Sequence, residues 1–115
     1  MMKKMEDNYK RIESNLRIGY YGNNPSACAD DHATLAGEYS FLCGLMEGVL
    51  KTKSAIWNEL RKNVKSDTSA DRAYDHTENG LNEIGLKLRM KGAEKMLSGL
   101  KSLIRNAENE AKNIF

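Results

Sequence analysis

Residues 35–60, LAGEYSFLCGLMEGVLKTKSAIWNEL, decide the fold of this 115-residue chain. Their apolar residues are separated by alternating steps of four and three, a heptad pattern with one polar member, Lys53. This spacing places a continuous seam along one face of an α-helix and predicts a long helix over about residues 31–65. The seam consists of Leu35, Tyr39, Leu42, Met46, Val49, Lys53, Ile56 and Leu60.

A shorter amphipathic helix is predicted before this segment, over about residues 5–18. Its apolar face consists of Met5, Tyr9, Ile12 and Leu16. Between the two helices lies GYYGNNPS, residues 19–26, which gathers turn-forming residues around the single proline, Pro25. Because the residue before a proline disfavours helical backbone, residues 19–30 are expected to form a loop.

A third helix is predicted over about residues 69–113, after the N-capping sequence SDTS at 66–69. Two apolar registers overlap within it between Leu81 and Met90. The overlap indicates either a stutter in one continuous helix or a break at Asn79-Gly80, and we favour continuity. The first register contains Ala70, Tyr74, Thr77, Leu81, Ile84 and Leu88, and the second contains Leu86, Met90, Ala93, Leu97, Leu100 and Ile104.

Composition agrees with an all-α protein, because charged residues make up 30% of the chain and aromatic residues only 7%. The length suits a single helical domain over residues 1–115. Charge alternates along the two long helices: residues 30–48 and 67–83 are acidic, whereas residues 51–65 and 87–105 are basic. This order favours an antiparallel hairpin, in which each acidic half lies beside a basic half.

Glycines recur inside the predicted helices at seven-residue steps, although each interior glycine costs about 1 kcal/mol relative to alanine. Close approach of another helix would compensate for this cost. A hairpin also leaves apolar width uncovered, which the first helix or a second chain must bury. We therefore expect a bundle completed by self-association, most simply a homodimer. The expected interface residues are Gly37, Gly44, Gly48, Trp57, Gly92, Met96, Gly99 and Leu103.

The basic half of the third predicted helix is the strongest candidate for ligand binding. Lys87, Lys91 and Lys95 lie four residues apart and form a ridge that could follow a phosphate backbone. Tyr20 and Tyr21 in the loop could stack on unpaired bases, although a tyrosine pair alone more often anchors its own loop against the bundle. The full candidate set for nucleic-acid binding is Lys87, Arg89, Lys91, Lys95, Lys101, Arg105, Tyr20 and Tyr21. The competing interpretation is that these cations serve the intramolecular hairpin or solubility.

Motifs for catalysis or metal binding are not evident. An acidic stripe beside His76 is better explained as a solvated face than as a cation site, and Cys28 and His32 lack a second ligand pair. The stripe consists of Asp67, Asp71, Asp75 and Glu78. No nucleophile or phosphate-loop motif is present, so we expect a non-enzymatic protein without metal or cofactor. We further expect no membrane span, no signal peptide and a cytoplasmic location.

The segment SDTSADRAYDHTENG at residues 66–80, followed by LKLRMKG at 86–92 and EKMLSGL at 94–100, resembles small helical accessory proteins of tailed bacteriophages and prophages. The likeness covers residues 57–105. It implies a phage setting, in which such proteins serve as adapters for replication or recombination or as inhibitors of a host protein. It implies no role for any single residue.

The function expected from the sequence is an accessory factor of DNA replication or recombination that contacts single-stranded nucleic acid. The alternative is a protein adapter or inhibitor that binds a host or phage protein through an apolar face, which the apolar width at Met96 and Leu103 suggests.

Overall fold

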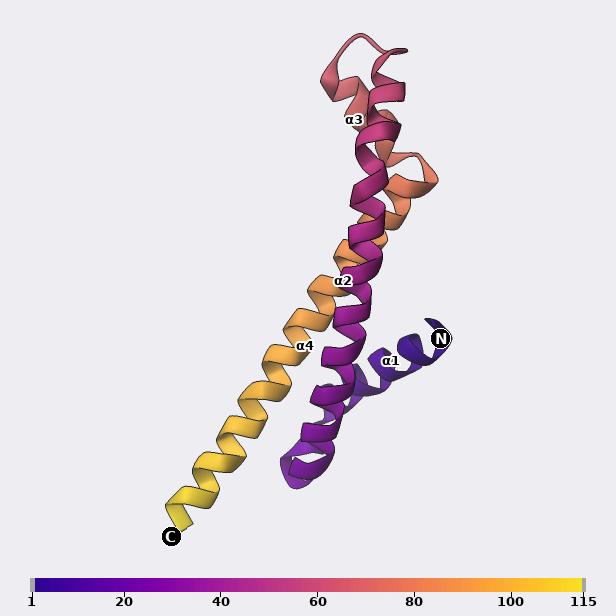
Figure 1. Cartoon of the computed structure of the whole chain (residues 1–115). Coiled ribbons are helices and arrows are strands. Elements are labelled where there is room, and N and C mark those ends of the chain that lie inside the picture. The colour runs from indigo at the N-terminus through magenta and orange to yellow at the C-terminus, as the bar shows by residue number, and fades with distance from the viewer. Residues whose placement is uncertain (1, 115) are drawn as a thin grey trace. The chain divides into compact units, whose positions relative to one another are not determined.

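The computed structural model describes residues 2–114, with side chains described for residues 3–112. The chain forms α1 (Met2–Ile18), a 3-10 helix η1 (Tyr20–Asn23), α2 (Pro25–Arg61), α3 (Asp67–Asp75) and α4 (Glu78–Ile114), as Figure 1 shows. No strand occurs among these residues, which confirms the all-α class. The chain divides into two compact units, Met1–Ser40 with Lys91–Phe115 and Phe41–Met90. Both α2 and α4 contribute residues to each unit.

The connection between α1 and α2 is shorter than the loop expected over residues 19–30. Gly19 follows the end of α1 with φ at +73°, a left-handed conformation that glycine adopts without a steric penalty. After η1, the carbonyl of Asn24 accepts a hydrogen bond from the N–H of Cys28 at 3.1 Å, so α2 is already helical from Pro25. Proline suits the first helical position, because its fixed φ is helical and no bond from its nitrogen is required there.

The core of the first unit joins α1, the start of α2 and the second half of α4. Ile12 and Leu100 are fully buried, and Leu35 is 2% exposed. Three members of the expected apolar face of α1 lie in this core, since Tyr9 and Leu16 pack against the same cluster as Ile12. The remaining buried members are Tyr21, Cys28, Ala93 and Met96.

The second unit contains α2 from Phe41 onwards, α3, and α4 up to Met90. α2 ends at Arg61, four residues before the expected end, and the Arg61 guanidinium donates to the carbonyl of Val64 at 2.9 Å. Ser66 is the N-cap of α3, and its hydroxyl accepts from the N–H of Ser69 at 3.1 Å. Of the four capping residues predicted at 66–69, the first one is therefore the N-cap.

The continuous helix expected over residues 69–113 is interrupted at His76 and Thr77. Thr77 caps α4, because its hydroxyl accepts from the N–H of Gly80 at 3.0 Å and donates to the carbonyl of Tyr74 at 2.6 Å. A Cβ at position 80 would clash with that same carbonyl oxygen. Gly80 therefore lies in the first turn of α4, where its missing side chain lets the carbonyl of Tyr74 approach. The break itself lies before it, at residues 76–77.

After the break, only one of the two apolar registers of α4 is buried. Residues of the second register face the protein, with Ala93 and Leu100 buried and Leu86 and Met90 partly buried. In the first register burial ends with Ala70, Tyr74 and the partly buried Thr77. Its later members, Leu81, Ile84 and Leu88, are 58%, 43% and 67% exposed.

Candidate nucleic-acid interface and its surroundings

Four of the six candidate cations on α4 are exposed and make no ion pair among the described side chains: Lys91, Lys95, Lys101 and Arg105. Their spacing places them within about one third of the helix circumference, on the side away from Ala93 and Leu100. From Lys91 to Arg105 the helix rises about 21 Å. These four residues are called the cationic face below.

Lys87 has a different setting from the cationic face. Its ammonium pairs with Glu83 at 2.8 Å, and that bond raises the pKa of Lys87. Arg89 is partly buried and also engaged within the chain. Lys87 therefore serves the second unit, which weakens its assignment as a ligand-binding residue.

The two tyrosines expected to stack on bases are placed differently from one another. Tyr21 is 3% exposed, and its hydroxyl donates to Asp31 at 2.6 Å. Its ring meets that of Tyr20 edge to face, with centroids 5.4 Å apart. Tyr20 is 43% exposed. Tyr21 thus anchors η1, and only Tyr20 presents a ring to solvent.

The carboxylate of Asp31 lies at the centre of a buried polar cluster that sequence reasoning missed. Arg11 of α1 donates to both of its oxygens, at 2.9 and 2.8 Å. Burial and the hydrogen bond to Asp31 raise the pKa of Tyr21 to about 12. The partner of Asp31, Arg11, lies on the solvent side of the apolar pattern of α1. No spacing in the sequence signals this pairing.

A second buried carboxylate, Glu83, organises the second unit. Glu83 is 5% exposed and accepts from Lys53 at 3.2 Å, Lys87 at 2.8 Å and the hydroxyl of Tyr74 at 3.0 Å. Burial alone would raise the pKa of Glu83, but these hydrogen bonds lower it below its ordinary value. Burial and the bond to Glu83 raise the pKa of Tyr74. The one polar residue in the heptad seam, Lys53, was the available signal for a buried acidic partner.

Four expected interface residues contact other residues of the same chain. A Cβ on Gly92 would collide with the Tyr9 hydroxyl, and a Cβ on Gly99 would lie 3.8 Å from Leu16. Met96 is buried, and Leu103 packs against the same cluster. The helix that approaches these glycines is α1, so within the first unit these residues pack against α1 and the core cluster.

The other expected interface residues lie on α2. Gly37, Gly44 and Gly48 are exposed, and a Cβ at any of them would meet no atom within 4 Å. Trp57 is partly buried, and its indole N–H donates to Asp71 at 2.8 Å. The close helix approach proposed for these three glycines is not made within the described part of the chain.

Two residues of the acidic stripe contact α2. Asp67 pairs with Arg61 at 2.8 Å, and Asp71 accepts from Trp57. No group of three or more His, Cys, Asp or Glu residues gathers for a metal among the described residues. Cys28 is buried, and its thiol contacts the carbonyl of Leu100 at 3.5 Å.

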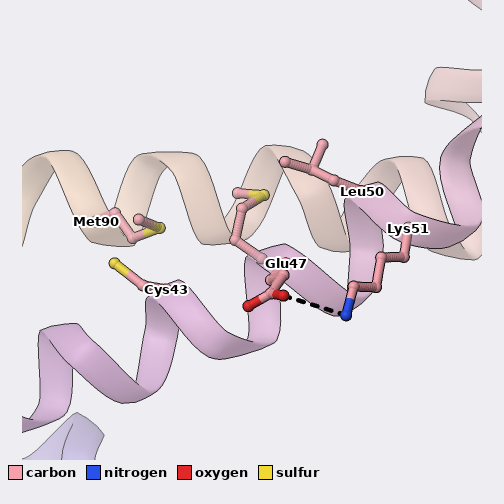
Figure 2. A pocket seen from close by; sticks show the side chains of 6 residues that line it. Cys43, Glu47, Leu50, Lys51 and Met90 are labelled. Carbon is pink, nitrogen blue, oxygen red and sulfur yellow. Dashed lines mark ion pairs between the residues drawn. The ribbon is translucent and has the colours of Figure 1, made fainter.

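An apolar groove lies in the second unit between α2 and α4. It has a volume of about 420 Å³ and is lined by Cys43, Met46, Glu47, Leu50, Lys51 and Met90. Figure 2 shows Cys43 and Met90 facing one another across it, while Glu47 and Lys51 pair on α2 at 3.1 Å.

Comparison of the chain with protein-family models, curated proteins and solved structures gives no match. Within residues 2–114 no helix has both the length and the apolar character needed to cross a membrane.

Proposed function

We propose that this chain is a non-enzymatic helical binding protein of phage type, an accessory factor of DNA replication or recombination that contacts single-stranded nucleic acid. The observation that carries the proposal is the cationic face: Lys91, Lys95, Lys101 and Arg105 are exposed on one side of a continuous helix. Their charge is not neutralised by an ion pair within the described side chains. A 21 Å row of cations suits about four phosphates of an extended strand.

The proposed assembly is a long antiparallel hairpin of α2 and α4, completed by self-association into a dimer. Hydrogen bonds within each unit indicate that α2 and the segment paired with it run in opposite chain directions. In the second unit, Lys53 pairs with Glu83 of α4. Arg61, further along α2, pairs with Asp67 of α3, which precedes Glu83 in the chain. In the first unit, Cys28 contacts Leu100 and Tyr39 bonds to Glu94.

Fluorescence anisotropy of a labelled single-stranded oligonucleotide tests the nucleic-acid function. If four phosphates are neutralised, the logarithm of the binding constant falls with the logarithm of salt concentration with a slope of about −3. Replacing Lys95 and Lys101 by Ala reduces this slope by about 1.4. The matched control is Lys3→Ala with Lys4→Ala, two exposed lysines of α1. Absence of salt-sensitive binding, or equal loss in test and control variants, would sink the proposal.

A protein adapter remains the second candidate, and the groove of Figure 2 favours it. The groove is lined by the thioether of Met90 together with Cys43 and Leu50, and methionine adapts well to varied apolar side chains. Unchanged partner capture from a phage-infected lysate after Leu50→Gln would argue against this candidate.

A further inference from the structure

Three sulfur-bearing side chains line the groove of the second unit, and none of them belongs to the cationic face. Cys43 and Met46 lie three residues apart on α2, a spacing that makes them neighbours on one side of the helix, and Met90 comes from α4. Figure 2 shows the thiol of Cys43 facing the thioether of Met90 across the groove. A thiol and two thioethers from two helices of the same unit therefore line one groove.

The thiol of Cys43 is accessible to a ligand. Cys43 is exposed and forms no disulfide, and its thiol makes no hydrogen bond with the described residues. Met46 is 8% exposed, and Met90 is partly buried. A methionine side chain has three rotatable bonds, so both thioethers can turn towards the thiol without a movement of the backbone.

The chemistry of these donors identifies the class of ion that suits them. Thiolate and thioether sulfurs are soft ligands, and they select Cu(I) over hard cations. Zinc prefers four thiolate, imidazole or carboxylate ligands, whereas this groove offers a single thiol. The one carboxylate of the groove, Glu47, is paired with Lys51 at 3.1 Å. The donor set therefore favours a soft monovalent ion.

We propose that the groove is a Cu(I) site, in which the thiolate of Cys43 and the thioethers of Met46 and Met90 hold one ion. On binding, the thiol of Cys43 loses its proton to solvent and its sulfur bonds to copper, which keeps its oxidation state. The ion enters through the exposed side of the groove, where Cys43 lies. The sequence analysis expected no metal because thioether ligands at positions 43–46 and 90 match no histidine, cysteine or carboxylate motif.

Competition with a coloured Cu(I) chelator, bicinchoninate, tests the site on the reduced full-length chain without oxygen. The wild-type chain is expected to withdraw one Cu(I) per chain from the chelator. Cys43→Ser should lower the affinity by at least about 100-fold, more than a change next to a ligand usually costs. It should keep its helical circular dichroism, because Cys43 is exposed. A wild-type chain that withdraws no Cu(I), or a Cys43→Ser variant with unchanged affinity, would overturn the proposal.

Replacement of a thioether separates a shared sulfur site from binding by the thiol alone. Met90→Leu keeps the apolar volume but removes the sulfur, and it should weaken Cu(I) binding by about tenfold or more. The matched control is Met96→Leu, which makes the same change in the core of the first unit and should leave the affinity unchanged. Equal affinities of these two variants would contradict the site.

X-ray absorption at the copper edge gives an independent measurement of the ligands. The bound ion should have sulfur neighbours only, and Met90→Leu should remove one of them. Nitrogen or oxygen neighbours in the wild-type complex would overturn the assignment.

The failure of this proposal is distinguishable from failure of the nucleic-acid or adapter function. Leu50→Gln leaves all three sulfurs in place, so it should keep Cu(I) uptake, and its loss would contradict the sulfur site. The Cys43 and Met90 variants retain the whole cationic face. A chain that binds the oligonucleotide but takes up no Cu(I) overturns the copper site alone. A chain whose Cu(I) uptake depends on Cys43 but which binds no oligonucleotide rejects only the nucleic-acid function.

Discussion

At the scale of single residues, Glu83 has the most informative environment. A buried carboxylate is costly unless it is paired, and Glu83 receives hydrogen bonds from two lysines and a tyrosine. These contacts explain why a lysine occupies the heptad seam at position 53. They also engage the ammonium of Lys87 within the second unit.

Protonation of Glu83 should destabilise the fold at low pH. Because its pKa is lowered in the folded state, its contribution to stability is present above the unfolded pKa and is lost as pH falls through the folded value. Glu83→Gln should therefore reduce the free energy of unfolding by about 1–3 kcal/mol at pH 7, and by progressively less below about pH 4. Urea denaturation at several pH values measures this difference.

The control for this prediction is Glu108→Gln, which changes an exposed carboxylate of the same helix. It should alter the free energy of unfolding by less than about 0.5 kcal/mol at every pH. A pH-independent effect of Glu83→Gln would show that the carboxylate's charge does not contribute to stability.

At the scale of elements, the sequence predicted the helices better than their ends. The heptad seam predicted a long second helix, and the apolar spacing predicted α1. α2 begins six residues before the expected start at residue 31, because Pro25 does not break the helix but is its first residue. The α3–α4 break was not favoured, because it depends on one hydroxyl, that of Thr77, and on the close approach of a carbonyl to Gly80.

Gly80→Ala tests the explanation given for this break. A methyl group at position 80 would collide with the carbonyl of Tyr74, so either α3 or the first turn of α4 must shift. We expect a loss of about 1–3 kcal/mol in the free energy of unfolding. Gly48→Ala, a helical position with no neighbour within 4 Å, should instead be neutral or stabilising by up to about 1 kcal/mol. Equal effects of the two substitutions in thermal unfolding would contradict this account.

The candidate site was predicted in part. Periodicity predicted that the α4 cations would share a face, and four of them do so without a carboxylate partner among the described residues. Sequence spacing could not show that Tyr21 is bonded to Asp31, because that contact depends on how η1 folds back on α2. For the same reason it could not show that α1 covers Gly92 and Gly99.

At the scale of the whole molecule, the alternating charge pattern is used less uniformly than expected. The basic half of α2 does pair with acids of α3 and α4, through Arg61 and Lys53. The acidic half of α2 instead pairs with α1, where Arg11 binds Asp31 and Asn8 donates to Glu38 at 2.7 Å. The cationic face, Lys91, Lys95, Lys101 and Arg105, makes no ion pair with these acids or with any other described side chain.

The central claim is that the chain binds other macromolecules, a second copy of itself and a single-stranded nucleic acid. The mass in solution, determined by sedimentation with and without an oligonucleotide, tests it most directly. The account predicts a shift from the 13.0 kDa monomer towards a dimer as concentration rises, and a further salt-sensitive increase when the oligonucleotide is added. A mass of 13.0 kDa at every concentration, unchanged by the oligonucleotide, would contradict it.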